Sequence, residues 1–595
     1  MEDIGQMRFG IMCNGLTFPA WAACCLQSLL ALEGVKPNLL IITPEPGPPH
    51  GWREKLRKVV LLKGLFWFLY RRLFIDTRST ALRPIHMEHA FSEVPRVVCD
   101  VFREGNCPGY FSNEEIATIR GYELDFILRF GTGIIRGDIL NVPRYGVWSF
   151  YYGDEEKYRG DPPCFWEIYN GDVVTGASLR RLTDCPDAGI ILHKGFFKTV
   201  NQSYVRNRDA AFFGSADWAA RVCKDIRNGC TTHLNVSPLR STAPVFHTPN
   251  NWQLVRFILK LIRNFLMNQF NSLFRIDQWN IGIGNVPIHT FLTPEAKPEI
   301  CWLPKPARGR SLADPFGIRE GSRTTILVED YHYRTQKGCI SVVKSMANNS
   351  FSAPKPVIDL PVHLSYPYLL EFQDDVFCVL AREHGPEVSL YRAKVFPNNW
   401  VKIGTLIKGF AAMDPTVFQY EGRWWLLCTD GDAGPDNKLY AWYASDLLGP
   451  WLPHAATPLK TDVRSSRPAG TPFVHQGELY RPAQDCSETY GGAVVLNRII
   501  RLTPTEFEEE PVRVVKPYPN SPYPDGLHTI SSVGDITIID GKRRIFIPHA
   551  FREVLRSKIN RVRRYVLGRL GSISVFATMN SYRLGEQGAR ESVED

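Results

Sequence analysis

The chain has 595 residues, 44% of them hydrophobic and 22% charged, and a formal net charge of +9. This length exceeds one ordinary domain, the composition is that of a globular protein, and the charge is too small for the length to indicate nucleic-acid binding. The 14 cysteines include no C-x-x-C pair. That spacing excludes a zinc ribbon and a small disulfide scaffold, so we expect no metal site and a reducing, cytoplasmic setting.

The chain opens with the pattern of an α/β domain. Met7 to Asn14 is predicted as a strand, Pro19 to Leu32 as a helix and Leu39 to Thr43 as the next strand. The stretch Phe9 to Leu32 carries no charge and is long enough to span a bilayer. Polar residues and a proline interrupt it, so we expect a helix packed on a sheet rather than a transmembrane helix.

Two later segments mix basic and apolar residues at helical spacing. They are Lys55 to Phe74 and Trp252 to Phe274. For the first we favour a helix packed on the sheet with its basic side chains reaching solvent, and for the second a helix that bridges two domains. The alternative for both is peripheral contact with a membrane surface.

The stretch from Asp125 to Leu192 shows a compact series of strands and turns. Predicted strands cover Phe126 to Phe130, Gly146 to Tyr152 and Thr175 to Leu182, and a fourth follows the turn Asp187-Ala188-Gly189. Asn170-Gly171-Asp172 is a strong turn signal. Because ligands of a parallel doubly wound sheet bind beyond the carboxyl ends of its strands, the Gly153 loop is placed where a site is expected.

Several short motifs in this stretch resemble the catalytic domain of the folate-dependent formyltransferases. The motifs are Pro143-Arg144-Tyr145-Gly146, Tyr158-Arg159-Gly160, Pro163 with Trp166, Ile168-Tyr169-Asn170-Gly171, Thr175-Gly176 and Asp187-Ala188-Gly189. The resemblance implies a doubly wound α/β domain over residues 1–205. It also implies 10-formyltetrahydrofolate as cofactor and an amino sugar or related amine as acceptor. The acceptor site it implies contains Arg159, Gly160, Trp166 and Asn170.

The catalytic positions depart from that family. The family uses an Asn, a His two residues later and the Asp of D-x-G to stabilise an oxyanion and move a proton. Here Ser149 and Tyr151 replace the first two, and Asp187 remains. A tyrosine, with an ordinary pKa of about 10, is a poor general base. Either the site is rebuilt around Tyr151, Tyr152, Asp154 and Asp187, or the domain binds without turnover; plain strand packing explains the two tyrosines equally well.

From about residue 300 a repeat of roughly fifty residues replaces the helical signals. Each copy has a polar or proline turn followed by short strands. The five turns are Ala313-Asp314-Pro315-Phe316, Ser365-Tyr366-Pro367-Tyr368, Met413-Asp414-Pro415-Thr416, Arg467-Pro468-Ala469-Gly470 and Leu527-His528-Thr529-Ile530. Five copies predict a five-bladed β-propeller. We place a helical connector at 206–295, the propeller at 296–555 and a basic tail at 556–595.

The turns of the repeat resemble two groups of proteins. Ser445-Asp446 with Gly449-Pro450-Trp451 is similar to a phrase of five-bladed glycoside hydrolase propellers, and the runs at Ala313, Ser365, Arg467, Tyr480 and Gly526 resemble the amino-terminal region of plant glucosamine inositolphosphorylceramide transferases. Both resemblances imply a carbohydrate ligand. The predicted funnel residues are Asp314, Asp414, Arg467, Arg481, Asp485 and His528.

Paired carboxylates with an Arg and a His could hydrolyse a glycosidic bond, one acid protonating the leaving oxygen and one base activating water. Glu329 and Glu383 are further candidates for the acid. An Asp before Pro also caps turns, so a purely structural role stays open. Three hypotheses follow: a formyltransferase-like enzyme with a carbohydrate-binding propeller, a hydrolase or glycan transferase acting in the propeller, or a non-catalytic glycan-binding protein.

Overall fold

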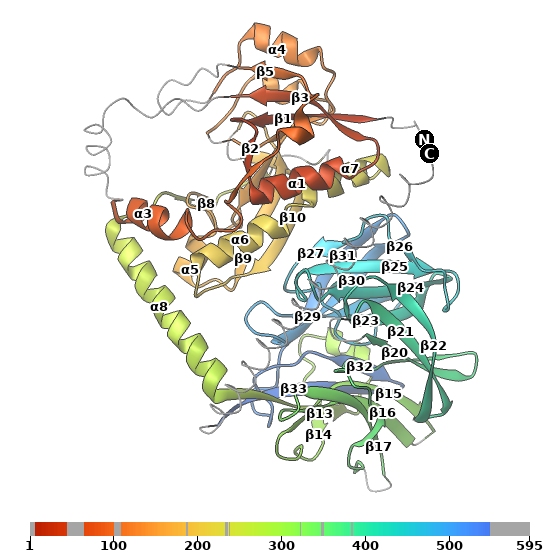
Figure 1. Cartoon of the computed structure of the whole chain (residues 1–595). Helices are drawn as coiled ribbons and strands as arrows, with labels where there is room; N and C mark the ends of the chain where they lie inside the picture. Colours follow the sequence, from red (N-terminus) through yellow and green to blue (C-terminus); the bar gives the residue numbers. More distant parts are fainter. Residues whose placement is uncertain are drawn as a thin grey trace, which may run out of the picture.

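A computed structural model describes residues 6–43, 65–99, 109–131, 133–185, 188–231, 236, 239–321, 323–346, 350–381 and 385–547. In chain order the protein consists of an α/β domain, one long helix and a β-propeller (Figure 1). The predicted basic tail and residues 55–64 of the first basic, apolar segment lie outside the described residues.

The α/β domain is built on one eight-stranded sheet with the order β11-β10-β9-β7-β6-β1-β3-β5. Its strands are β1 (Met7–Cys13), β3 (Val35–Ile42), β5 (Arg96–Val98), β6 (Phe126–Arg129), β7 (Val147–Tyr152), β9 (Val174–Arg181), β10 (Ala188–Lys198) and β11 (Leu239–Arg240). The five strands from β5 to β7 pair in parallel, and β9, β10 and β11 continue the sheet in antiparallel pairing. Small two-stranded sheets join β2 (Thr17–Pro19) to β4 (Pro84–His86) and β8 (Arg159–Gly160) to β12 (Val245–Phe246).

Helices cover this sheet on both faces. They are α1 (Ala20–Leu30), α3 (Leu65–Tyr70) with a π-helical turn (Arg71–Ile75), α4 (Asn113–Arg120), α5 (Trp166–Asn170), α6 (Tyr204–Gly214) and α7 (Trp218–Arg227), with short 3-10 turns at His89–Phe91 and Asp138–Asn141. Two buried cores result. One packs α1, α6 and α7 around Trp148 and Trp218, and the other packs α4 against Ile127 and Val147.

The propeller consists of five sheets, as the repeat predicts; four have four strands and one has five. Four blades follow one another along the chain, and the first two consist of β15 (Arg310–Glu320), β16 (Arg323–His332), β17 (Lys337–Lys344) and β18 (Lys355–Ile358), and of β19 (Tyr368–Phe372), β20 (Asp375–Ala381), β21 (Glu387–Val395) and β22 (Asn398–Lys408). The third consists of β23 (Ala412–Tyr420), β24 (Arg423–Asp430), β25 (Lys438–Ala444) and β26 (Leu452–Pro453), with β27 (Lys460–Thr461) paired to β25. The fourth consists of β28 (Phe473–His475), β29 (Glu478–Asp485), β30 (Ala493–Leu502) and β31 (Phe507–Val515).

The fifth blade closes the ring by combining the two ends of the propeller. It joins β13 (Arg275–Gly284) and β14 (Ile300–Trp302) to β32 (Ile530–Val533) and β33 (Ile536–Phe546), with a 3-10 turn at Ile288–Leu292 between the first two. β13 and β33 pair antiparallel along their length, from Arg275 opposite Phe546 to Gly284 opposite Thr537. Closure leaves no unpaired edge between the first and last strands.

The structure moves two of the predicted boundaries. Residues 206–227 are not part of a connector, because α6 and α7 bury Phe212, Trp218 and Ile226 in the core of the α/β domain. The propeller starts at Arg275 rather than 296, because β13 supplies a central strand of the closing blade. The connector is reduced to the single helix α8 (Asn251–Phe274), close to the predicted 252–274.

The two domains also touch directly. Phe196 on β10 accepts a hydrogen bond through its carbonyl from Val463 N (3.0 Å), and Lys438 on β25 lies 2.7 Å from Asp217. Arg464 stacks its guanidinium over the ring of Phe196 at 3.9 Å. Together with α8 these contacts hold the propeller beside the α/β domain (Figure 1). Among the helices that the structure describes, none is both long and apolar enough to cross a membrane.

Candidate functional site

The propeller carries a cluster of polar side chains where its innermost strands begin. Asp314, Tyr366 and Asp414 occupy the same place in three successive blades and have φ angles of +51°, +50° and +52°. This left-handed backbone is uncommon for residues other than glycine. The ladders shift register beside Asp314 and Asp414, so each is a β-bulge that re-aims a side chain. Backbone strain of this kind, held by the surrounding structure, is characteristic of functional sites.

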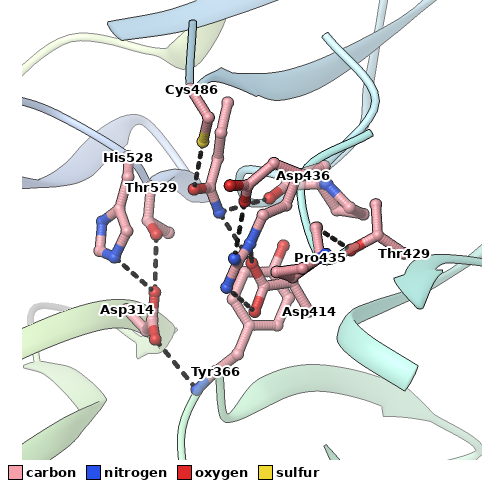
Figure 2. A network of polar contacts seen from close by, with 12 residues as sticks. Asp314, Tyr366, Asp414, Thr429, Pro435, Asp436, Cys486, His528 and Thr529 are labelled. Atoms are coloured by element: carbon pink, nitrogen blue, oxygen red, sulfur yellow. Dashed lines mark hydrogen bonds and ion pairs between the residues drawn. The ribbon is translucent and has the colours of Figure 1, made fainter. Parts of the chain in front are cut away.

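Asp314 is buried and held from three directions. One carboxylate oxygen accepts a hydrogen bond from Tyr366 N (3.1 Å), and the other accepts one from the Thr529 hydroxyl (2.9 Å). His528 Nε2 lies 3.5 Å from that second oxygen. Figure 2 shows His528 and Thr529 on one side of Asp314 and the Tyr366 nitrogen on the other.

Behind His528 lies a second buried carboxylate. Asp540 Oδ2 is 2.5 Å from His528 Nδ1, and Asp540 Oδ1 accepts hydrogen bonds from His528 N and Thr529 N. Burial raises the pKa of Asp314 to about 6, reinforced by Asp414 and Asp540 although His528 opposes it. Burial lowers the pKa of His528, but Asp540 and Asp314 outweigh it and the net shift is upward. Both shifts favour a proton on the Asp540–His528–Asp314 series, which we call the proton store.

Asp414 has a different environment. Arg467 Nε lies 2.6 Å from one carboxylate oxygen of Asp414, and Gln484 donates a hydrogen bond to the same oxygen at 2.7 Å. Arg467 also contacts Asp436 at 3.0 Å and stacks on the ring of Tyr490. Asp314 thus lies beside the His528–Asp540 pair, whereas Asp414 lies beside the Arg467 guanidinium. In sites with two carboxyl groups, such a difference in surroundings makes one carboxyl group the acid and the other the base.

Asp314, Asp414, Arg467 and His528 line one cavity of about 290 Å³ on the propeller axis. Its other walls are Asp277, Trp279, Ser311, Ala313, Glu329, Tyr331, Tyr333, His363, Ser365, Met413 and Tyr490. Trp279 stacks on His528 with ring centroids 4.0 Å apart. Polar groups with aromatic walls suit a sugar, whose hydroxyls need partners and whose ring faces are apolar.

Sequence reasoning missed part of this site. Tyr366 stands at the repeat position that holds Asp314 and Asp414, so the repeat itself is the signal that could have found it. Trp279 lies on β13, which the predicted boundary excluded from the propeller. Asp540 and Tyr490 carry no motif, because their roles arise from the folding of distant strands around the axis.

Two predicted funnel residues lie elsewhere. Arg481 is 1% exposed and points into its own blade, where it lies 2.6 Å from Glu509. Burial opposes the charge of Glu509, but Arg481 and Lys460 outweigh it and lower the pKa of Glu509 to about 2. Asp485 accepts a hydrogen bond from Ser487 N (3.0 Å) in the turn after β29. Arg481 and Asp485 therefore have structural roles, because inward and outward side chains alternate along a strand. Glu383 lies outside the described residues.

Asp314, His528 and Asp540 also form the arrangement closest to a cation site in the described part of the chain. Their ligand atoms all lie within 4.8 Å of one another. Asp540, however, already accepts hydrogen bonds from three backbone amides, those of Asp314, His528 and Thr529. Asp314 in turn accepts hydrogen bonds from Tyr366 N and the Thr529 hydroxyl. The chemistry of the three groups fits proton storage better than metal binding.

In the α/β domain, the side chains of the two tyrosines of β7 pack against neighbouring residues and are hydrogen-bonded. The Tyr151 hydroxyl donates to Tyr158 O (2.8 Å), and the ring lies 4.0 Å beneath the Arg180 guanidinium. Burial raises the pKa of Tyr151 to about 12. Tyr152 packs against Trp21 and its hydroxyl lies 3.2 Å from Ser215 Oγ. A hydroxyl with a pKa this high is not a general base at neutral pH.

The other predicted catalytic positions lie nearby. Ser149 is half-buried on β7 and stands opposite Arg180 of β9. Asp154 follows β7 and lies 3.7 Å from Lys194. Asp187 lies outside the described residues. One ionisable group that sequence reasoning missed is Glu167 on α5, a side chain 1% exposed whose pKa burial raises to about 8.

The predicted acceptor residues make contacts within the domain. Arg159 donates to Ala243 O (2.6 Å), Trp166 donates to Asp161 O (3.1 Å), and Asn170 donates to the Tyr158 hydroxyl (3.2 Å). Gly160 has φ +97°, and a Cβ there would stand 2.0 Å from Phe246 O. The R-G motif is thus required by the close pairing of β8 with β12.

Comparisons with known proteins divide the chain in the same way. Residues 305–520 match the family model described as glucosamine inositolphosphorylceramide transferase 1, N-terminal. The rice (Oryza sativa subsp. japonica) enzyme of that name is 34% identical over 209 residues, which is 34% of this chain and 28% of the relative. The chain therefore spans little more than a quarter of that relative's length. Methionyl-tRNA formyltransferase of Agathobacter rectalis is 34% identical over 80 residues, 13% of this chain and 26% of the relative.

Solved structures show weaker likeness. Zg3597, a family 117 glycoside hydrolase of Zobellia galactanivorans, is 13% identical with a TM-score of 0.30, covering 45% of this chain and 91% of that one. Phosphoribosylglycinamide formyltransferase of Anaplasma phagocytophilum is 11% identical with a TM-score of 0.25, covering 38% and 88%. The five-bladed propeller is established by the strand pairing of this chain itself.

The Arg481–Glu509 pair yields a stability prediction. We expect Arg481→Ala to lower the free energy of unfolding by about 3 kcal/mol, because it leaves a buried carboxylate with Lys460 as its remaining cation. Urea unfolding measures the change. Arg498→Ala, which removes an exposed ion pair with Glu478 and Glu510, is the control and should change stability little. Equal losses in the two variants would contradict the assignment of Arg481 as a buried structural residue.

Proposed function

We propose that this protein is a glycan-processing protein whose carbohydrate site is the propeller funnel. The observation that carries the proposal is the convergence of two buried carboxyl groups, Asp314 and Asp414, with different electrostatic surroundings on one aromatic-walled cavity. The matched relatives, which are named as glucosamine inositolphosphorylceramide transferases, support a sugar as ligand. Because the chain covers only part of those relatives, we carry over the ligand class and not their whole activity.

In this proposal the two carboxyl groups have separate tasks. Asp314, supplied with a proton by the His528–Asp540 pair, donates it to the leaving oxygen of a glycosidic bond. Asp414, held by Arg467 and Gln484, assists the attacking water or acceptor hydroxyl. The same groups also suit binding without turnover, since each can accept hydrogen bonds from sugar hydroxyls.

The funnel proposal predicts the effect of conservative substitutions. We expect Asp314→Asn and Asp414→Asn each to reduce glycan turnover about 10²–10⁴-fold, the range for losing a positioned acid or base. Oligosaccharide binding can be followed by the fluorescence of Trp279 in the cavity wall, and turnover by chromatography of the products. Asp485→Asn is the control, because this carboxylate belongs to a turn outside the cavity. Saturable binding without turnover would leave the protein as a glycan-binding protein; neither binding nor turnover would overturn the proposal.

Formyl transfer in the α/β domain is the second candidate. The partial identity to methionyl-tRNA formyltransferase favours it. The residues described at the family's catalytic positions do not fit the chemistry, because Tyr151 is hydrogen-bonded and has a raised pKa. We therefore derive no step through a folate cofactor.

Calorimetry distinguishes the two candidates. We expect no saturable binding of a stable 10-formyltetrahydrofolate analogue to the full chain at millimolar concentration, because Ser149 and Tyr151 replace the two family side chains that act at the formyl group, and the Tyr151 hydroxyl already donates to Tyr158 O. Saturable binding that Asp187→Ala abolishes would contradict this and return formyl transfer to the first place.

We further propose that the protein sits at a membrane surface through α3 and α8. α8 buries only Leu254 and Phe257 of its 24 residues. Trp252, Leu259 and Leu266, spaced by seven residues on one side of the helix, are 74%, 61% and 60% exposed. α3 and the turn after it, which lie beside the start of α8, add the exposed side chains Phe66, Phe68, Leu69, Leu73 and Phe74.

The charges of this face favour an anionic bilayer as its partner. Residues 65–75 and 251–274 contain no acidic residue, and Arg71, Arg72 and Arg256 add exposed positive charge to them. Exposed aromatic and aliphatic side chains flanked by cations are the pattern of helices that lie in the membrane interface. These exposed side chains and charges support membrane contact through the outward sides of α3 and α8, although Trp67 of α3 packs on the α/β domain and α8 bridges the two domains as expected.

Vesicle binding tests the membrane contact. We expect the full chain to co-sediment with phosphatidylcholine vesicles that contain phosphatidylserine, and less with phosphatidylcholine alone. Leu259→Gln combined with Leu266→Gln should weaken binding by a factor on the order of ten or more, because each leucine contributes roughly 1.5–3 kcal/mol when buried. Leu448→Gln with Leu452→Gln, on exposed propeller leucines, is the matched control. A dimer in solution that the α8 variant dissociates would show instead that this face joins two copies of the chain.

A further inference from the structure

A second and larger cavity, of about 910 Å³, lies next to the funnel, between the propeller and the α/β domain. We call it the basic chamber. Its walls are the turn at Gly171–Asp172, the segment from Lys198 to Arg206, the α8 residues from Lys260 to Ser272, and the propeller residues Arg275, Asp277, Tyr333, Ser487–Thr489 and Arg544. Asp277 and Tyr333 also line the funnel cavity, so the two cavities are adjacent.

The chamber gathers positive charge from both domains and from α8. Its six cations are Lys198, Arg206, Lys260, Arg263, Arg275 and Arg544, against the three carboxylates Asp172, Asp277 and Glu488. Two of these carboxylates are already engaged. Asp172 accepts a hydrogen bond from the Tyr158 hydroxyl (2.8 Å) and lies 3.5 Å from Lys157. Asp277 lies 3.6 Å from Arg544.

The remaining five cations have no ion-pair partner among the described residues. Lys198 and Lys260 donate hydrogen bonds only to neutral carbonyls, those of Cys486 (3.1 Å) and Tyr169 (2.9 Å). Arg263 contacts the side-chain oxygen of Asn264 at 3.4 Å. Burial lowers the pKa of Lys260, and the like charges of Arg263 and Arg256 lower it further. Like charges held together without a counterion repel, and a bound anion relieves that repulsion.

We propose that the basic chamber binds a phosphate group of the ligand whose sugar enters the funnel. Three features favour phosphate over a single carboxylate: the number of unpaired cations, their origin on several walls, and the presence of three unpaired arginines, whose planar forks match phosphate oxygens. The sugar half of this inference rests on the proposed function of the funnel; the phosphate half rests on the chamber alone.

Calorimetry with three probes tests the inference on the full chain: inorganic pyrophosphate, glucose 1-phosphate and UDP-glucose. We expect all three to bind saturably, with affinity falling as salt is raised because the contacts are ionic. Lys260→Gln with Arg263→Gln should weaken the binding of each probe by about tenfold or more, since the variant loses two charge-assisted hydrogen-bond donors. Tighter binding of glucose 1-phosphate would indicate a sugar monophosphate ligand, and tighter binding of UDP-glucose a nucleotide-linked sugar.

A second test variant and a control variant accompany this experiment. Arg206→Gln with Arg275→Gln removes cations from two other walls and repeats the test if the α8 variant does not fold. Lys355→Gln, an exposed lysine at the start of β18 outside both cavities, is the control. Absence of pyrophosphate binding, or an equal loss of affinity in the Lys355 variant, would contradict the proposal that the basic chamber binds phosphate.

The outcomes also separate this inference from the proposed function. If pyrophosphate binding depends on the chamber cations and no glycan binding depends on Asp414, the phosphate site in the chamber is supported and the sugar site in the funnel is contradicted. If a neutral oligosaccharide binds in a manner that depends on Asp414 and pyrophosphate does not bind, the sugar site in the funnel is supported and the phosphate site in the chamber is contradicted.

Discussion

The left-handed backbone at the start of three inner strands is the constraint on which the propeller site depends. An L-residue at φ near +50° is unfavourable alone, and the proline that follows Asp314, Tyr366 and Asp414 prevents the backbone from relaxing into a helix. The bulges at Asp314 and Asp414 turn these two carboxylates into the funnel cavity. There Asp314 is held by a Tyr366 amide from the next blade and by Thr529 from the last, so the site exists only when the ring is closed.

Closure of the propeller ring brings side chains from the first and last propeller strands into the funnel site. β13 and β33 complete the last blade, and they carry Trp279 and Asp540 on either side of His528. The direct contacts between the domains then bring the basic chamber against the funnel mouth. A ligand with both a sugar and an anionic group is therefore matched by two adjacent cavities of different character.

Much of this arrangement was readable from the sequence, and the failures have physical causes. The repeat predicted five blades and placed Asp314, Asp414, Arg467 and His528 correctly in one cavity. It misplaced Arg481, because a repeat position does not say which face of a strand a side chain occupies. It missed β13, because a closing strand is separated from its blade by more than two hundred residues and has no local signal.

The motifs of the first domain show the opposite situation. Gly160 and Gly176 stand where a Cβ would meet Phe246 O at 2.0 Å and the Asp154 backbone at 2.9 Å, so their motifs record tight packing. Positions 149 and 151 hold the residues that differ from the formyltransferases, and the Tyr151 hydroxyl bonds Tyr158 O within the domain. A resemblance built on packing residues predicts a fold and leaves the reaction open.

A crystal structure of the full chain with a bound oligosaccharide phosphate would test the central claim most directly. The account predicts a sugar ring within hydrogen-bonding distance of Asp314 and Asp414 and a phosphate among Lys260, Arg263 and Arg275. Ligand bound instead beside β7 of the α/β domain, or on the outer strands of the blades with the funnel empty, would contradict it.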